Sequence, residues 1–186
     1  MKRFFDIAIG LLLFILLVIP ILFLAITIKV TSKGSVLYWS ERVGRENVNF
    51  MMPKLRTMRS DTPQLATHLM CDPDEYLSQI GGFLRRTSLD ELPQLWSILK
   101  GNMSFVGPRP ALFNQKDLVA LRTDQGVNRL IPGMTGWAQV NGRDELPIPE
   151  KVKLDAEYME RQSFWFDMYI LWLTMLKVVW RDGVSH

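Results

Sequence analysis

Two adjacent acids, Asp90 and Glu91, lie in the segment LRRTSLDELPQLWSILKGNMSFVGPRP, residues 84–110. Three arginines flank the pair: Arg85, Arg86 and Arg109. A carboxylate can attack phosphorus or hold a metal ion, and arginine forks grip phosphate oxygens. The residue types and their spacing therefore indicate chemistry on a phosphate group.

A helix cap is the structural alternative for the acid pair. Ser88 and Glu91 match the spacing of a capping box, and acids are stabilised in the first turn of a helix. Pro93 would then be the fifth helical residue, where its missing N–H costs a hydrogen bond. We therefore expect the helix to start later, and the residues alone leave both roles open, a helix cap and catalysis.

Further cations and polar groups stand near the acids in sequence order. Gly107-Pro108-Arg109-Pro110 is a stiff turn in which glycine lets the backbone approach a phosphate, although such a turn is also a common structural corner. Lys54 and Arg56 alternate along a strand and would point to one side, either into a site or into solvent. Gln139 and Arg143 are the remaining candidates for substrate contact.

The elements that must position these residues follow from the sequence pattern. Residues 36–43 and 48–55 are rich in β-branched and aromatic side chains around Gly44-Arg45-Glu46-Asn47, which predicts a β-hairpin. Helical spacing over 112–130 predicts a helix that carries Arg122 on its surface. Alternating charges over 150–162 predict an exposed helix.

An apolar run without a charge extends from Ile7 to Ile28, and as a helix it would measure about 33 Å, enough to cross a bilayer. The run is too long for a signal peptide and no cleavage site follows it. Pro20 predicts a kink. Basic residues flank both ends, so a kinked spanning helix and a helix broken at Pro20 that returns to the same face are both open.

The C-terminal stretch 164–180 combines aromatic residues with Asp167 and Lys177. This mixture is typical of an interfacial amphipathic helix at the headgroup boundary, with a buried core helix as the alternative. We therefore divide the chain into a membrane helix at 1–35, a catalytic domain at 36–162, and an interfacial helix and tail at 163–186.

Composition excludes several classes of protein. The chain has 186 residues and a net charge of +3, and its first 36 residues already supply that charge (four cations less one acid). The folded domain thus sums to zero, whereas nucleic-acid binding would need a basic surface on it. One cysteine and two histidines do not make a zinc site or a disulfide. Rossmann, P-loop and serine-esterase signatures are absent from the sequence.

Four motifs in order, KLRTM, SLDELPQLW, KGNMSFVGPRP and PGMTGWAQVNGR, make the chain resemble the bacterial monotopic phosphoglycosyl transferases, over nearly its whole length. The resemblance implies a small α/β (α+β) domain, mostly helical with a short β-hairpin. It also implies a re-entrant membrane helix that keeps this domain on the cytoplasmic face of the bacterial cytoplasmic (inner) membrane. Ile19 stands before Pro20 where some members of the family carry serine.

The resemblance further implies a reaction. Asp90 would attack the β-phosphate of a UDP-sugar, release UMP and form a phosphosugar-aspartyl enzyme, and undecaprenyl phosphate would take the phosphosugar. Glu91 would bind metal or deprotonate the acceptor, and Mg²⁺ suits two carboxylates facing a diphosphate. The reaction would be the first membrane step of O-antigen, capsule, exopolysaccharide or glycoprotein glycan synthesis.

Two other functions remain as alternatives at this point. A membrane-bound UDP-sugar hydrolase would use the same aspartyl intermediate with water as acceptor, and a non-catalytic adaptor would use the arginines to bind anionic membrane lipids. The sequence does not identify the sugar. It also leaves the oligomeric state open, an isologous homodimer included.

Overall fold

The computed structural model of the chain describes residues 1–59, 62, 74–142 and 146–180. Within them the fold is mostly helical, with an antiparallel β-hairpin and a second, parallel pair of short strands. The predicted α+β class is confirmed. In chain order the elements are α1 Lys2–Thr31, β1 Leu37–Val43, η1 Arg45–Asn47, β2 Asn49–Leu55, η3 Asp74–Tyr76, α2 Gly81–Arg86, η4 Leu89–Gln94, α3 Leu95–Lys100, β3 Ser104–Val106, α4 Lys116–Asp124, η5 Val127–Arg129, β4 Gly133–Thr135, α5 Trp137–Val140, α6 Ile148–Arg161 and α7 Phe164–Trp180.

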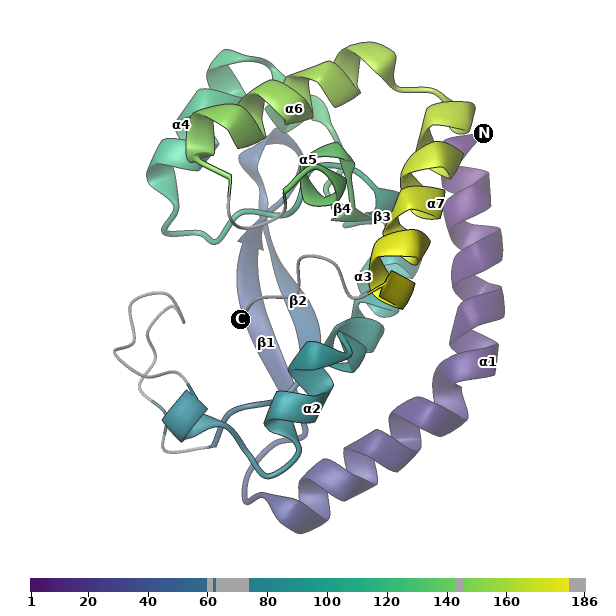
Figure 1. The fold of residues 1–186 in the computed structure, drawn as a ribbon, viewed down its shortest axis with the longest axis vertical. Coiled ribbons are helices and arrows are strands. Elements are labelled where there is room, and N and C mark those ends of the chain that lie inside the picture. The colour runs from purple at the N-terminus through teal and green to yellow at the C-terminus, as the bar shows by residue number, and fades with distance from the viewer. Residues whose placement is uncertain (60–61, 63–73, 143–145, 181–186) are drawn as a thin grey trace.

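The hairpin crosses the middle of the molecule, as Figure 1 shows, with α6 at one end and α2 at the other. Its register pairs Leu37 with Leu55 and Val43 with Asn49, which confirms the predicted hairpin. Glu46 and Asn47 in the connection have positive φ, which a tight reversal requires. The opposite edge of β1 is joined through Arg42 to Leu112, so the hairpin is tied to the segment before α4.

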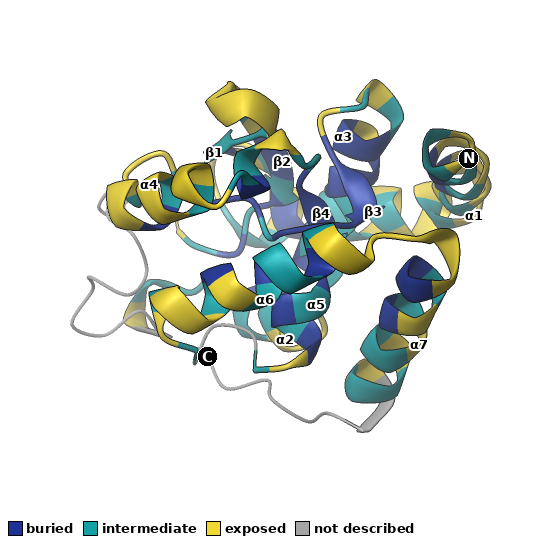
Figure 2. Ribbon diagram, turned by 90° about the horizontal axis from the view of Figure 1, so that it is seen from above, coloured by how far each residue is buried: buried dark blue, intermediate teal, exposed yellow. Residues whose placement is uncertain are grey.

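The main core lies where β3, β4 and α3 meet α6 and α7, and Figure 2 shows the buried residues gathered there. Ile98, Tyr158 and Ile170, each nearly inaccessible, come from three different helices of this core. The predicted helix over 150–162 is therefore not exposed all round. Its position as α6 is confirmed, but one face, including Asp155, is buried.

Helix α1 is the one described helix that is long and apolar enough to cross a membrane, judged by length and composition. Pro20 lies inside it, and the predicted break is a bend in one continuous helix (Figure 1). The physical reason is that proline removes one hydrogen bond while the neighbouring bonds of the helix remain.

Both ends of α1 contact the rest of the protein. Near its start, Asp6 is 3% exposed and accepts hydrogen bonds from the Ser104 hydroxyl and the Phe105 N–H, at 3.0 and 3.1 Å. Near its end, Ile28 is buried against Leu55 and Leu84. The outward side chains between these contacts are apolar and exposed: Leu12, Ile15, Leu16, Ile19, Leu22 and Phe23 among them.

Helix α7 has one buried face and one exposed apolar face. Phe166 and Ile170 belong to the core, whereas Trp165 and Trp172 are 79% and 58% exposed. The two sequence expectations for this stretch, interfacial helix and core helix, thus describe opposite faces of the same helix. An exposed apolar face of this kind is typical of elements that contact a membrane or another protein.

Candidate active site

The acid pair lies on η4, a short 3₁₀ helix packed against β2. Ser88 before it has a left-handed backbone with φ of 55°, and its side chain makes no cap hydrogen bond. The capping-box alternative is therefore wrong, and the α-helix begins later, at Leu95. Pro93 explains the geometry, since 3₁₀ structure tolerates a residue that cannot continue an α-helical ladder.

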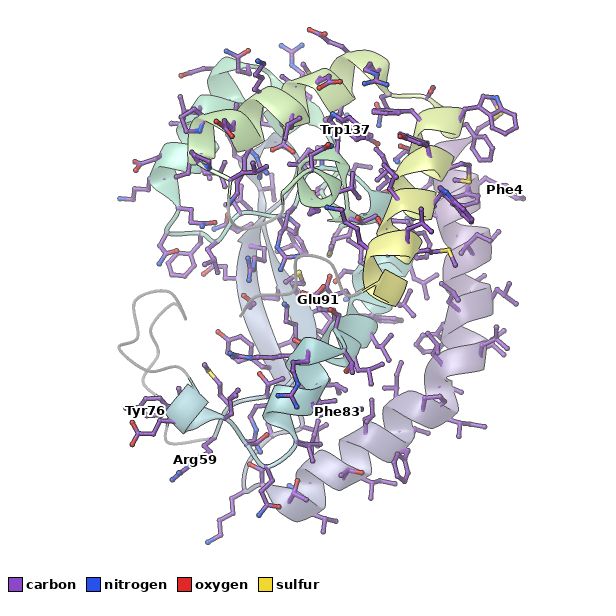
Figure 3. The ribbon with its side chains drawn as sticks, in the orientation of Figure 1. Phe4, Arg59, Tyr76, Phe83, Glu91 and Trp137 are labelled. Carbon is purple, nitrogen blue, oxygen red and sulfur yellow. The ribbon has the colours of Figure 1, made fainter. Side chains whose placement is uncertain are left out.

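Glu91 is the charged centre of the site and is labelled in Figure 3. Its Oε1 atom lies 2.7 Å from the Lys54 ammonium and 3.4 Å from Nη2 of Arg109. The side chains of Lys54 and Glu91 are 16% and 14% exposed, so this pair is only thinly screened by water. The structure thus brings together one acid and two of the predicted phosphate-binding cations.

Asp90 has a different environment from its neighbour. It is 9% exposed, and no side chain in the described part of the chain donates a hydrogen bond to its carboxylate. Burial raises the pKa of Asp90 most strongly; Lys54 and Arg85 act in the opposite direction, and the Glu91 charge raises it further. The result is a poorly solvated acid that feels the charges of two cations, an environment that is common at functional sites.

The remaining predicted cations are spread around the acids. Arg85 donates from Nε to the Thr57 hydroxyl at 3.0 Å, and Arg86 is exposed on α2. Arg56 donates to the carbonyl and hydroxyl oxygens of Ser32, at 3.2 and 3.0 Å. Lys54 and Arg56 therefore have different partners, and the expected joint grip is absent from the described contacts.

Glycine at 107 has a packing reason. A Cβ on Gly107 would lie 2.4 Å from the Ile131 carbonyl oxygen and 2.9 Å from the Gly133 nitrogen. The Gly107 N–H donates to the Thr135 oxygen at 2.8 Å, so strand β3 and the β4 segment are in backbone contact here. A direct phosphate contact by Gly107 stays a prediction.

Two residues predicted to contact substrate, Gln139 and Arg143, have no described contact with the acid pair. Both amide atoms of Gln139 are buried and make no hydrogen bond, and Gln139 has no described contact with the acid pair. Arg143 lies outside the described residues. For these two residues a substrate contact stays a prediction.

Residues that could hold a metal ion are Asp90 and Glu91. Among residues 1–59, 62, 74–142 and 146–180, no group of three His, Cys, Asp or Glu side chains could hold one. Two neighbouring carboxylates still fit Mg²⁺, which is commonly bound by one or two carboxylates together with substrate phosphate oxygens and water. A complete protein cage is therefore not needed for this ion.

Arg122 is the site residue that the sequence pattern misplaced. It was expected on the surface of a helix, but its side chain is 11% exposed and its guanidinium donates to Asp155 and to the Arg109 carbonyl. Helical spacing could not show this, because the acid that neutralises Arg122 is 33 residues away on another helix. Asp155 was missed for the same reason.

Comparison with known proteins identifies the family of this chain. The family model described as bacterial sugar transferase matches residues 1–181, and this chain belongs to that family. It is 36% identical to the uncharacterized sugar transferase EpsL of Bacillus subtilis, over the whole of this chain and 91% of that protein. The chain is a transferase by this membership.

Two further relatives have names that state a reaction. The chain is 37% identical to the UDP-glucose:undecaprenyl-phosphate glucose-1-phosphate transferase of Escherichia coli, over 95% of this chain and 40% of the relative. It is 35% identical to the undecaprenyl-phosphate galactose phosphotransferase of Salmonella typhimurium, over 98% of this chain and 41% of the relative. The chain therefore spans about two fifths of these two proteins.

Proposed function

We propose that this protein transfers a sugar 1-phosphate from a UDP-sugar to undecaprenyl phosphate, through a covalent intermediate on Asp90. The observation that carries the proposal is the unequal treatment of the two acids. Glu91 is bound by Lys54 and Arg109, whereas Asp90 is buried beside it without a side-chain hydrogen-bond donor among the described residues. Asp90 is the better candidate nucleophile, because its carboxylate is in no ion pair among the described residues, whereas Lys54 and Arg109 occupy the Glu91 carboxylate.

In the first step an Asp90 carboxylate oxygen attacks the phosphorus that carries the sugar. A bond from Asp90 to phosphorus forms, the bond from that phosphorus to the bridging oxygen breaks, and UMP leaves. We expect Lys54 and Arg109 to bind the oxygens of the transferring phosphate. Both cationic groups contact the carboxylate of Glu91, which is next to Asp90 in the chain. Arg85 adds a further positive charge that acts on Asp90.

In the second step a phosphate oxygen of undecaprenyl phosphate attacks the same phosphorus. The acyl-phosphate bond breaks, Asp90 is restored, and the sugar is joined to the lipid through a diphosphate. Glu91 lies next to the nucleophile and is the residue to receive or release an acceptor proton. The product is the lipid-linked sugar that opens a glycoconjugate pathway.

Mg²⁺ fits the proposed reaction, with Asp90 and Glu91 as the residues to hold it. A bound Mg²⁺ would neutralise the diphosphate that two carboxylates otherwise repel. The buried aspartate beside the cation-held glutamate is a suitable donor set, since both residues supply hard oxygen ligands.

We place the catalytic domain on the cytoplasmic face of the inner membrane, with α1 as a re-entrant helix. Asp6 at one end of α1 and Ile28 near the other are both buried in the same globular domain, so both ends belong on one side of a bilayer. Exposed apolar side chains between them and on α7 suit the headgroup boundary and lipid chains.

The topology is tested with single cysteines ahead of Met1 and at Lys33→Cys, in a Cys71→Ser background. In inverted membrane vesicles we expect a membrane-impermeant maleimide to label both. Labelling of one cysteine in inverted vesicles and the other only in right-side-out cells would establish a spanning helix.

The reaction is tested with purified protein, Mg²⁺ and a panel of UDP-sugars, with and without undecaprenyl phosphate. We expect UMP release coupled one to one with lipid-linked sugar, and none from Asp90→Asn. With no acceptor, a radiolabelled sugar phosphate should remain on the wild-type protein after denaturation and be absent from Asp90→Asn.

Each of the other outcomes would indicate a different function for this protein. Release of UDP would mean ordinary glycosyl transfer. Release of UMP that continues without lipid would mean a UDP-sugar hydrolase. No release from any UDP-sugar, with binding to anionic lipid vesicles retained, would favour a membrane adaptor.

A further inference from the structure

The turn that presents Arg109 is held from three directions. The Gly133 N–H donates to the Pro108 carbonyl at 2.9 Å, Nη1 of Arg122 to the Arg109 carbonyl at 2.8 Å, and Nη1 of Arg42 to the Pro110 carbonyl at 3.2 Å. Every carbonyl of Pro108-Arg109-Pro110 therefore has a donor. The two prolines have fixed φ angles, so these bonds leave the backbone little freedom.

Arg122 supplies the middle bond and is itself fixed by Asp155. Its Nε and Nη2 atoms lie 2.9 and 2.7 Å from Oδ2 of Asp155, which leaves Nη1 to reach the Arg109 carbonyl. The Asp155 side chain is 1% exposed. Burial raises the pKa of Asp155 and the Arg122 charge opposes that shift, as expected for an acid that depends on its partner.

A buried ion pair of this kind is a weak source of stability, because desolvation offsets much of its attraction and apolar side chains often replace it without loss. The Arg122–Asp155 pair also supplies a hydrogen-bond donor to the Arg109 carbonyl, which apolar side chains could not supply. The planar guanidinium serves two acceptors at once with fixed directions, which a lysine ammonium cannot reproduce.

We infer that Arg122 and Asp155 are positioning residues for Arg109. The chain of contacts runs from Asp155 on α6 through Arg122 on α4 to the Arg109 carbonyl, and the Arg109 side chain then reaches Glu91. The pair touches no reacting atom in this scheme. The inference rests on the proposed function, in which Arg109 binds the transferring phosphate.

Arg122→Lys is the informative substitution. It keeps a positive charge beside Asp155 but loses the planar guanidinium that bonds Asp155 and the Arg109 carbonyl together. We expect kcat for phosphosugar transfer to fall about tenfold to a hundredfold, with a smaller change in KM for the UDP-sugar, since misplacing a catalytic group mainly weakens transition-state contacts. In an Arg109→Lys background, where the fork at Arg109 is already lost, the same change should cost less than about threefold.

Asp167→Asn is the matched control. Asp167 is also a buried acid with a cation partner, accepting from Lys2 at 2.5 Å and from the Tyr158 hydroxyl at 2.7 Å, but it has no described contact with the Arg109 turn. The fold-loss of kcat in the Asp167→Asn and Arg109→Lys double variant should equal the product of the two single fold-losses, as expected for independent sites. If Arg122→Lys also multiplies with Arg109→Lys, or leaves kcat unchanged, the positioning role is wrong.

A readout without turnover separates this inference from the proposed function. The amides of Gly107 and Gly133 donate hydrogen bonds on either side of the turn, and their hydrogen exchange should quicken at least about tenfold in Arg122→Lys and stay unchanged in Asp167→Asn. Unchanged exchange in Arg122→Lys would overturn the positioning role. Absence of transfer in the wild-type protein would overturn the proposed function alone, because the exchange result does not depend on it.

Discussion

Two buried aspartates in this protein have opposite surroundings. Asp90 on η4 is 9% exposed, and no side chain in the described chain donates to its carboxylate. Asp155 on α6 is 1% exposed and accepts two bonds from one guanidinium. Burial raises the pKa of both. The comparison shows that burial alone does not define the role of an acid. The Asp155 carboxylate is held in an ion pair with Arg122, whereas Asp90 is in no ion pair among the described residues, which is why we propose Asp90 as the nucleophile.

The largest expected effect is on turnover when the available acid is changed. Asp90→Asn keeps the size of the side chain but removes the proposed nucleophile, and we expect transfer to fall by about 10⁴-fold or more. Asp155→Asn should retain a far larger share of transfer. UMP release measured for both variants under the same conditions checks this, and equal losses would remove the functional distinction between the two aspartates.

The second effect is on stability when the paired acid is removed. Asp155→Ala leaves the Arg122 charge buried without its partner, and breaking such a pair typically costs about 3–5 kcal/mol. Chemical unfolding followed by circular dichroism in detergent measures the loss. A parallel Asp155→Ala and Arg122→Met double variant should recover much of it, because no charge is then left unpaired.

The third effect is a gain of stability at the active site. The pKa of Asp90 is raised in the folded protein, so the folded state binds a proton more tightly and loses stability as pH rises through that pKa. Asp90→Asn carries no such charge and should be more stable than the wild type at pH 7, by on the order of 1 kcal/mol. The difference should disappear as the pH falls below the pKa of an unfolded aspartate, about 3.9. Melting temperatures across this pH range test it, and a less stable Asp90→Asn at pH 7 would contradict it.

The smallest expected effect is a shift in pH dependence. The Lys54 charge lowers the pKa of Asp90 against the larger effect of burial. Lys54→Met should therefore raise that pKa further, and the acid limb of kcat/KM should move to higher pH while overall activity falls. Lys100→Met is the matched control, because Lys100 lies over the Trp96 ring on α3 and is not among the charges that shift the pKa of Asp90. An unmoved limb in Lys54→Met would mean that Asp90 is not the titrating group.

Helix α1 shows how far sequence reasoning extends. The apolar run and the kink at Pro20 were predicted from composition and from the covalent geometry of proline. That the bend keeps continuous helix on both sides, and that Asp6 is buried against Ser104 and Phe105, follow from packing with residues about a hundred positions away. A charge so near the N-terminus would otherwise be expected at the membrane surface.

The sequence by itself determined the hairpin, the apolar helix, and the acid pair with its arginines, because these depend on local periodicity, local backbone preferences and short motifs. Only the tertiary structure decided which acid is engaged and which is available, because that depends on Lys54 and Arg109, 36 and 19 residues from Asp90. The same holds for Arg122, whose burial depends on a partner from another helix. Long-range pairing of charges leaves no periodic signal in the chain, and it is what separates the two aspartates.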